Sequence, residues 1–216
     1  MRVEVWSDIV CPWCYLGKRR LEKALAGFEH AGDVEVEWRS FQLDPSFPKG
    51  LGQPVYEALA RKTGATAAQV RGMTEHVKAL AAEEGLAYDF DRSVMANTFD
   101  AHRLTHLAKT HGIGAEMHER LMRANLVEGE VVDDAETLVR LGAEVGVPAG
   151  EARRVLAGDA YSREVMEDVN QARALGATGV PFFVLDRTYG ISGAQPVEAF
   201  LGALRTAREH AATRAG

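Results

Sequence analysis

The 216-residue sequence predicts an α/β fold in which a small mixed sheet is interrupted by a large, all-helical insertion. Three observations predict this class. Strand patterns lie near both ends of the chain, a long Ala-, Leu-, Glu- and Arg-rich stretch lies between them, and Gly- and Pro-dense segments separate the two compositions. We therefore assign the sheet-forming domain to residues 1–45 and 158–216, and the inserted helical domain to residues 46–157.

The N-terminal segment predicts a β–α–β unit. Residues 2–7 (RVEVWS) alternate apolar and polar side chains, as a short strand does. A helical pattern follows from Pro12, with an apolar stripe that starts at Leu21 and repeats at i+4 and i+7. Alternation returns over residues 34–43. Two strands joined by a helix favour a parallel pair with a right-handed crossover.

Helical patterns fill the middle of the chain, and a sheet pattern returns after them. We expect helices over 54–63, 66–84, 95–111, 114–126, 134–145, 149–157 and 159–175. Asp133 and Asp134 provide a helix N-cap region. Residues 180–186 (VPFFVLD) predict a strand, residues 187–192 its hairpin partner, and the residues from 197 onward a closing helix.

The charge distribution argues against several kinds of partner. A net charge of −6 offers no basic excess to neutralise nucleic-acid phosphates, and we expect the basic run Lys18-Arg19-Arg20 to form a solvated helix face. Arg2, Glu4 and Asp8 interrupt any signal-peptide core, and no stretch approaches the roughly 18 apolar residues of a membrane span. We therefore expect a cytoplasmic protein that binds neither nucleic acid nor a membrane.

Cys11 and Cys14 are the only cysteines, and they flank the predicted start of the first helix. One helical turn holds their Cα atoms about 5 Å apart, which a disulfide can bridge. Pro12 suits the first helical position, so Cys11 becomes the N-cap, where free N–H groups and the helix dipole favour a thiolate. Cys14 lies one turn inside and is less solvated. We predict that Cys11 attacks a disulfide and that Cys14 resolves the mixed disulfide.

Other interpretations of the pair are open at this point. A structural disulfide would staple only four residues in a reducing compartment. Two idle core thiols are a second alternative. A zinc site would need two more ligands, which His102 and His106 could supply from one helix face. A C-x-x-C motif beside a β–α unit is more typical of redox chemistry, and the redox group is then the dithiol itself, with no bound cofactor or metal.

The β–α–β opening, the CPWC motif at its junction and the helical interruption resemble the thioredoxin superfamily, and more specifically the FrnE-like branch of the DsbA-family oxidoreductases. Three segments in order carry the resemblance: SDIVCPWCYLGKRRLEKAL (7–25), NTFDAHRLTHLA (97–108) and GVPFFVLDRTYGISGAQPVEAFLGAL (179–204). The resemblance implies a thioredoxin-like fold and a protein disulfide oxidoreductase or isomerase. It implies protein or small-thiol disulfides as substrates, a recycling reductant or oxidant, and a monomer or homodimer.

The resemblance also assigns residues around the dithiol. Val180 and Pro181 match a segment whose proline is cis and faces the dithiol. A cis bond would leave the backbone N–H and C=O of Val180 free to pair with a substrate, as one strand pairs with another. Pro12 and Trp13 lie between the cysteines, and we expect Trp13 to be exposed, where it could contact substrates or shield the disulfide.

Two further residues match a segment of the helical domain that overhangs the active site in this family. Asn97 makes a good helix N-cap, which is the interpretation that we favour, and it is also a candidate substrate contact. His102 could face the pocket and act on Cys11 electrostatically, or it could be a satisfied histidine elsewhere.

A related branch provides an alternative function. The glutathione-dependent 2-hydroxychromene-2-carboxylate isomerases and kappa-class glutathione transferases share the inserted-helix plan, with glutathione as co-substrate and a small aromatic substrate. They carry a serine at the position of Cys11 and do not need the second cysteine. The presence of both cysteines favours dithiol chemistry in this chain.

Overall fold

A four-stranded mixed sheet forms the centre of the computed structural model, which describes residues 1–215. The strands are β1 (Arg2–Ser7), β2 (Glu35–Ser40), β5 (Phe182–Leu185) and β6 (Tyr189–Ser192). Their order across the sheet is β2-β1-β5-β6, with β1 and β2 parallel and the other neighbours antiparallel. The sheet thus joins strands from both ends of the chain, and the predicted α/β class is confirmed.

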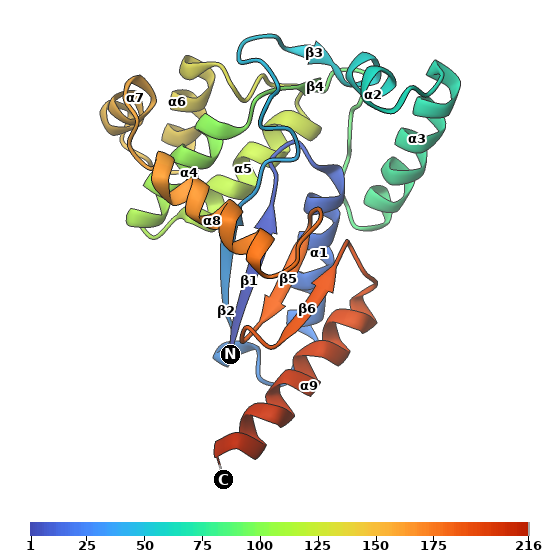
Figure 1. The fold of residues 1–216 in the computed structure, drawn as a ribbon, viewed down its shortest axis with the longest axis vertical. Coiled ribbons are helices and arrows are strands. Elements are labelled where there is room, and N and C mark those ends of the chain that lie inside the picture. The colour runs from blue at the N-terminus through green and yellow to red at the C-terminus, as the bar shows by residue number, and fades with distance from the viewer. Residues whose placement is uncertain (216) are drawn as a thin grey trace.

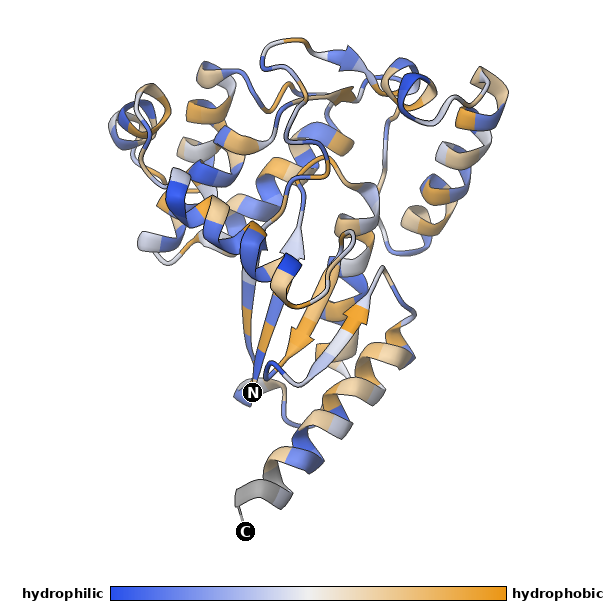
Figure 2. Ribbon diagram, in the orientation of Figure 1, coloured by the Kyte–Doolittle hydropathy of each residue, from blue (hydrophilic) through white to orange (hydrophobic). Residues whose placement is uncertain are grey.

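Helices cover both faces of this sheet (Figure 1). They are α1 (Pro12–Ala26) and α9 (Val197–Ala215) on one face and α8 (Ser162–Ala174) on the other. On the first face Phe183 of β5 meets Phe200 of α9, with ring centroids 4.7 Å apart. On the second face Trp6 of β1 packs near Ala172 and donates a hydrogen bond of 2.8 Å to the carbonyl of Asp168. Figure 2 shows the strongly hydrophobic character of β5 between these layers.

The segment between β2 and β5 carries most of the helices. Besides α8, they are α2 (Val55–Thr63), α3 (Ala67–Glu83), α4 (Phe99–Thr110), α5 (Gly114–Leu126), α6 (Ala135–Glu144) and α7 (Ala149–Ala157). A short 3-10 turn at Ala31–Asp33 precedes β2. Local capping explains two helix starts. Thr66 forms a reciprocal capping box with Gln69, and the Asp134 carboxylate accepts from the N–H of Thr137 at 2.8 Å. The predicted N-cap region before α6 is therefore confirmed.

The insertion differs from the expected all-helical region at one place. Two short strands, β3 (Gln53–Pro54) and β4 (Val94–Met95), form an antiparallel ladder. A two-residue strand has no periodicity to detect, and Pro54 cannot donate to the ladder, which keeps it short. No helix within residues 1–215 is long and apolar enough to cross a membrane.

The expectation of a solvated basic face on α1 is wrong, because this face packs against the helical insertion. Lys18 is only 6% exposed, pairs with Glu119 of α5 at 2.7 Å, and lies 5.7 Å from the ring centroid of Trp38. Arg20 donates to Glu84, just beyond α3, at 3.2 Å. These charges therefore join the sheet-forming part of the chain to the helices between β2 and β5.

Candidate active site

Cys11 occupies the N-cap of α1 in an extended conformation (φ −91°, ψ 111°), and Pro12 takes the first helical position. The N–H of Cys14 donates to the carbonyl of Cys11 at 3.0 Å, which closes the first turn. Both cysteines are free thiols in the structure. The geometry thus places two thiols one turn apart at the amino end of a helix, as the sequence predicts.

The two thiols differ in their surroundings. Cys14 is fully buried, whereas Cys11 is 4% exposed and borders a cavity. Burial, followed by the hydrogen bond and charge of the adjacent Cys11 sulfur, raises the pKa of Cys14 well above its usual range. The backbone of Asp8 and the hydroxyl of Ser7 oppose this rise in pKa. Cys14 is therefore held as a protonated thiol behind the more accessible Cys11.

The segment that precedes β5 faces Cys11. The Val180–Pro181 peptide bond is cis, and the Val180 carbonyl oxygen lies 3.8 Å from the Cys11 sulfur. The Pro181 ring also lies close to α1. Its Cγ is 3.1 Å from the position that a Cβ would take on Gly17 of this helix. The two expected residues Val180 and Pro181 are thus next to the dithiol.

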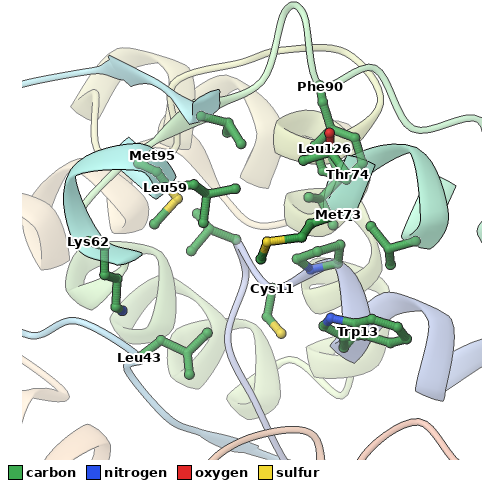
Figure 3. Close-up of a pocket in the computed structure, with 14 residues that line it drawn as sticks. Cys11, Trp13, Leu43, Leu59, Lys62, Met73, Thr74, Phe90, Met95 and Leu126 are labelled. Carbon is green, nitrogen blue, oxygen red and sulfur yellow. The ribbon is translucent and has the colours of Figure 1, made fainter. Parts of the chain in front are cut away.

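A cavity of about 220 Å³ opens beside Cys11, between α1 and the helical insertion (Figure 3). Of the expected site residues, Cys11, Pro12 and Trp13 line it. The other lining side chains come from the segments before α1 and after β2, from α2, α3 and α5, and from β4 and the segment that precedes it. Trp13 is 39% exposed, in agreement with its expected accessibility.

Asn97 and His102 do not line this cavity. The N-cap of α4 is Thr98, one residue after the favoured Asn97. The Asn97 side chain still shapes the start of this helix, because it accepts from the N–H of Phe99 at 3.0 Å and donates to the carbonyl of Phe47 at 2.6 Å. His102 is 1% exposed and lies 3.3 Å from the Asp8 carboxylate, which is also buried. Both residues thus act in the buried framework behind the site.

Two residues that the sequence did not single out support the dithiol. The Asp8 carboxylate accepts from the N–H groups of Ile9 (2.8 Å) and Leu43 (2.7 Å), and the Asp8 carbonyl accepts from the N–H of Cys11 at 3.2 Å. The Tyr88 hydroxyl donates to the carbonyl of Pro12 at 2.6 Å. The only sequence signal for the role of Asp8 was its position between a strand and the C-x-x-C motif. Tyr88 lies in a distant loop, and the sequence held no signal for its role.

A buried histidine completes this framework. His118 of α5 is 2% exposed, shares a hydrogen bond of 3.1 Å with the Ser7 hydroxyl, and stacks on Trp38 at 4.5 Å between ring centroids. Burial, followed by the charge of His102, lowers the pKa of His118 well below its usual range. No group of three His, Cys, Asp or Glu side chains within the described chain could hold a metal ion.

Comparisons with known proteins agree with this geometry. The family model of the DSBA-like thioredoxin domain matches residues 2–205. The crystal structure of the probable DsbA oxidoreductase SCO1869 from Streptomyces coelicolor is 50% identical, with a TM-score of 0.94 over 97% of this chain and 90% of that one. The uncharacterized protein YwbO of Bacillus subtilis is 29% identical over 93% of this chain and 94% of its own length.

A more distant structure shares the fold alone. The cytosolic disulfide reductase DsbM from Pseudomonas aeruginosa is 20% identical, with a TM-score of 0.66 over 95% of this chain and 98% of that one. The family match covers nearly the whole chain, from the first strand into α9. The chain therefore belongs to the family of DSBA-like thioredoxin domains.

Proposed function

We propose that the protein is a dithiol–disulfide oxidoreductase that uses Cys11 and Cys14. The observation that carries this proposal is the asymmetry of the two thiols: Cys11 borders a cavity at the helix N-cap, whereas Cys14 is fully buried one turn behind it. Thiol–disulfide exchange needs one accessible attacking sulfur and one sheltered resolving sulfur within disulfide range.

The reaction proceeds in two displacements. The Cys11 thiolate attacks one sulfur of a substrate disulfide, forms a mixed disulfide and releases the first substrate thiolate. Cys14 then loses its proton and attacks the Cys11 sulfur, which releases the second thiolate and closes the Cys11–Cys14 disulfide. Two electrons pass from the enzyme dithiol to the substrate. A dithiol reductant must return them to the enzyme before the next turnover.

The backbone of Val180 supports substrate alignment. Its carbonyl oxygen lies 3.8 Å from the Cys11 sulfur and immediately precedes β5. An extended substrate segment that pairs with the backbone at Val180 would bring its own sulfur toward Cys11. We propose protein or small-thiol disulfides as substrates in the cytoplasm, because thiols there are kept reduced and a close cysteine pair serves exchange rather than stapling.

Insulin reduction and the refolding of scrambled ribonuclease test the proposal. The wild-type protein should accelerate both reactions, and Cys11→Ser should abolish the acceleration. Equal rates for wild type and Cys11→Ser would remove Cys11 from the mechanism. Glutathione-dependent isomerase chemistry, which needs no second cysteine, would instead survive the substitution Cys14→Ala.

A further inference from the structure

The cavity beside Cys11 has an apolar rim that is open to solvent. Six large hydrophobic side chains of the described chain are exposed, and three of them line this one cavity: Trp13 (39%), Leu43 (38%) and Met73 (51%). These three come from α1, the segment after β2 and α3 (Figure 3). Separate elements therefore converge to form an apolar surface around the reactive sulfur.

The cavity lining contains one basic side chain. Thr74 is a lining residue, but its hydroxyl donates to the carbonyls of Val70 (3.1 Å) and Arg71 (3.0 Å) in its own helix. Lys62 is the only charged side chain in the lining, and it has no ion-pair partner in the described part of the chain. Figure 3 shows Lys62 and Trp13 on opposite sides of Cys11. An acidic group that entered with an apolar one would find its only partner at Lys62.

The volume of the cavity beside Cys11 limits the size of the molecule that it can bind. An engineered apolar cavity of about 150 Å³ binds benzene, and drug-sized ligand sites begin at about 300 Å³. The cavity beside Cys11, at about 220 Å³, therefore accommodates one ring or one branched chain with a small substituent. Half of a glutathione disulfide is longer and carries two carboxylates and an ammonium, most of which an apolar lining would leave without partners.

We propose that this cavity binds one half of a low-molecular-weight disulfide in which each half is apolar and carries one acidic group; that group pairs with Lys62 while the sulfur meets Cys11. The inference rests on the proposed function. The Cys11 thiolate attacks the substrate sulfur, one acidic thiolate leaves, and Cys14 expels the second as the enzyme disulfide closes. The two electrons come from the enzyme dithiol, which an external dithiol restores.

Single-turnover reactions of the reduced enzyme with three disulfides test this selectivity. Dithiobis(nitrobenzoate) is aromatic and acidic, dithiodipyridine is aromatic without an acid, and hydroxyethyl disulfide has neither property. Acid quenching, alkylation and mass spectrometry count the remaining thiols for all three. Lys62→Gln should slow only the acidic disulfide, by about two- to fivefold. Met73→Gln should slow both aromatic disulfides by about two- to fourfold and leave hydroxyethyl disulfide unchanged.

Arg61→Gln is the matched control, because Arg61 is exposed on the same helix and does not line the cavity. An equal effect of Arg61→Gln and Lys62→Gln, or a uniform effect of Lys62→Gln on all three disulfides, would overturn the proposal. So would full activity of Met73→Gln toward both aromatic disulfides. A wild-type enzyme that reduces none of the three, or a Cys11→Ser variant that reacts like wild type, would refute the proposed function instead.

Discussion

The Cys11 sulfur lies 3.8 Å from the carbonyl oxygen of Val180, although 169 positions separate the two residues in the chain. The sheet explains this proximity. Trp6 near the end of β1 pairs with Phe182 at the start of β5, and the two strands are antiparallel. The chain therefore leaves β1 toward Cys11 at the same end of the sheet at which it enters β5 from Val180. The central strand pair thus fixes the distance between the Cys11 sulfur and the backbone of Val180.

Gly17→Ala should slow thiol–disulfide exchange without a comparable loss of helicity. A Cβ at Gly17 would lie 3.1 Å from both the Pro181 Cγ and the Phe183 ring, closer than ordinary contact. The segment next to Val180 must shift to admit the methyl group, and we expect this overpacking to cost about 1–3 kcal/mol, partly offset by the gain in helix propensity. Exchange rates and urea denaturation measure the two effects.

Gly202→Ala is the control for helix propensity. Gly202 lies in α9, and a Cβ there meets nothing within 4 Å. This variant should gain about 0.5–1 kcal/mol of stability and keep the wild-type exchange rate. If Gly17→Ala gained stability to the same extent and exchanged thiols at the wild-type rate, the contact with Pro181 would have no role in positioning.

Asp8→Ala should destabilise the protein by about 2–5 kcal/mol, because the buried N–H group of Ile9 and the partly buried N–H group of Leu43 both lose their acceptor. His102→Phe should lower the free energy of unfolding by less, since His102 makes only one contact with the same carboxylate, a longer one at 3.3 Å. The loss of stability for Asp8→Asn should lie between those for Asp8→Ala and His102→Phe, because the amide keeps one acceptor oxygen. Urea titrations rank the three variants, and a smaller loss for Asp8→Ala than for His102→Phe would contradict this role of Asp8.

Sequence periodicity predicts the parts of this fold whose apolar residues repeat along the chain. Val3 and Val5 alternate with the charged Glu4 in β1, which made the strand detectable, although Glu4 is buried too. Lys18 was expected at the surface and Asp8 was not singled out, yet both are buried, because partners from distant helices satisfy them. Such pairings depend on tertiary packing, which leaves no local pattern in the sequence. The cysteine motif was detectable because its chemistry depends on a spacing of one helical turn.

The stability of the protein should fall as the pH drops from about 7 to 5, and His118 should contribute to this slope. In the unfolded chain a histidine takes up a proton near pH 6.5. The folded protein resists this protonation, because burial lowers the pKa of His118. The unfolded state therefore binds more protons below pH 6.5, and the free energy of unfolding declines by up to about 1.4 kcal/mol per pH unit.

His118→Gln should reduce this slope, which urea titrations at several pH values would measure. His30→Gln is the matched control, since His30 lies at an exposed position and its loss reports the effect of removing any histidine. A slope that is identical in wild type and His118→Gln would show that His118 takes up its proton equally in both states.

Cys14→Ala should trap a mixed disulfide between Cys11 and a substrate. Cys14 is fully buried and lies one turn behind Cys11, so no other thiol of the chain can resolve the intermediate, and Cys11→Ala should form no adduct at all. Because the pKa of Cys14 is raised, its deprotonation should limit resolution in the wild type, and the lifetime of the adduct should shorten as the pH increases. Mass spectrometry of quenched reactions measures that lifetime. An adduct that decays equally fast in wild type and Cys14→Ala would show that a second substrate thiol, rather than Cys14, completes the exchange.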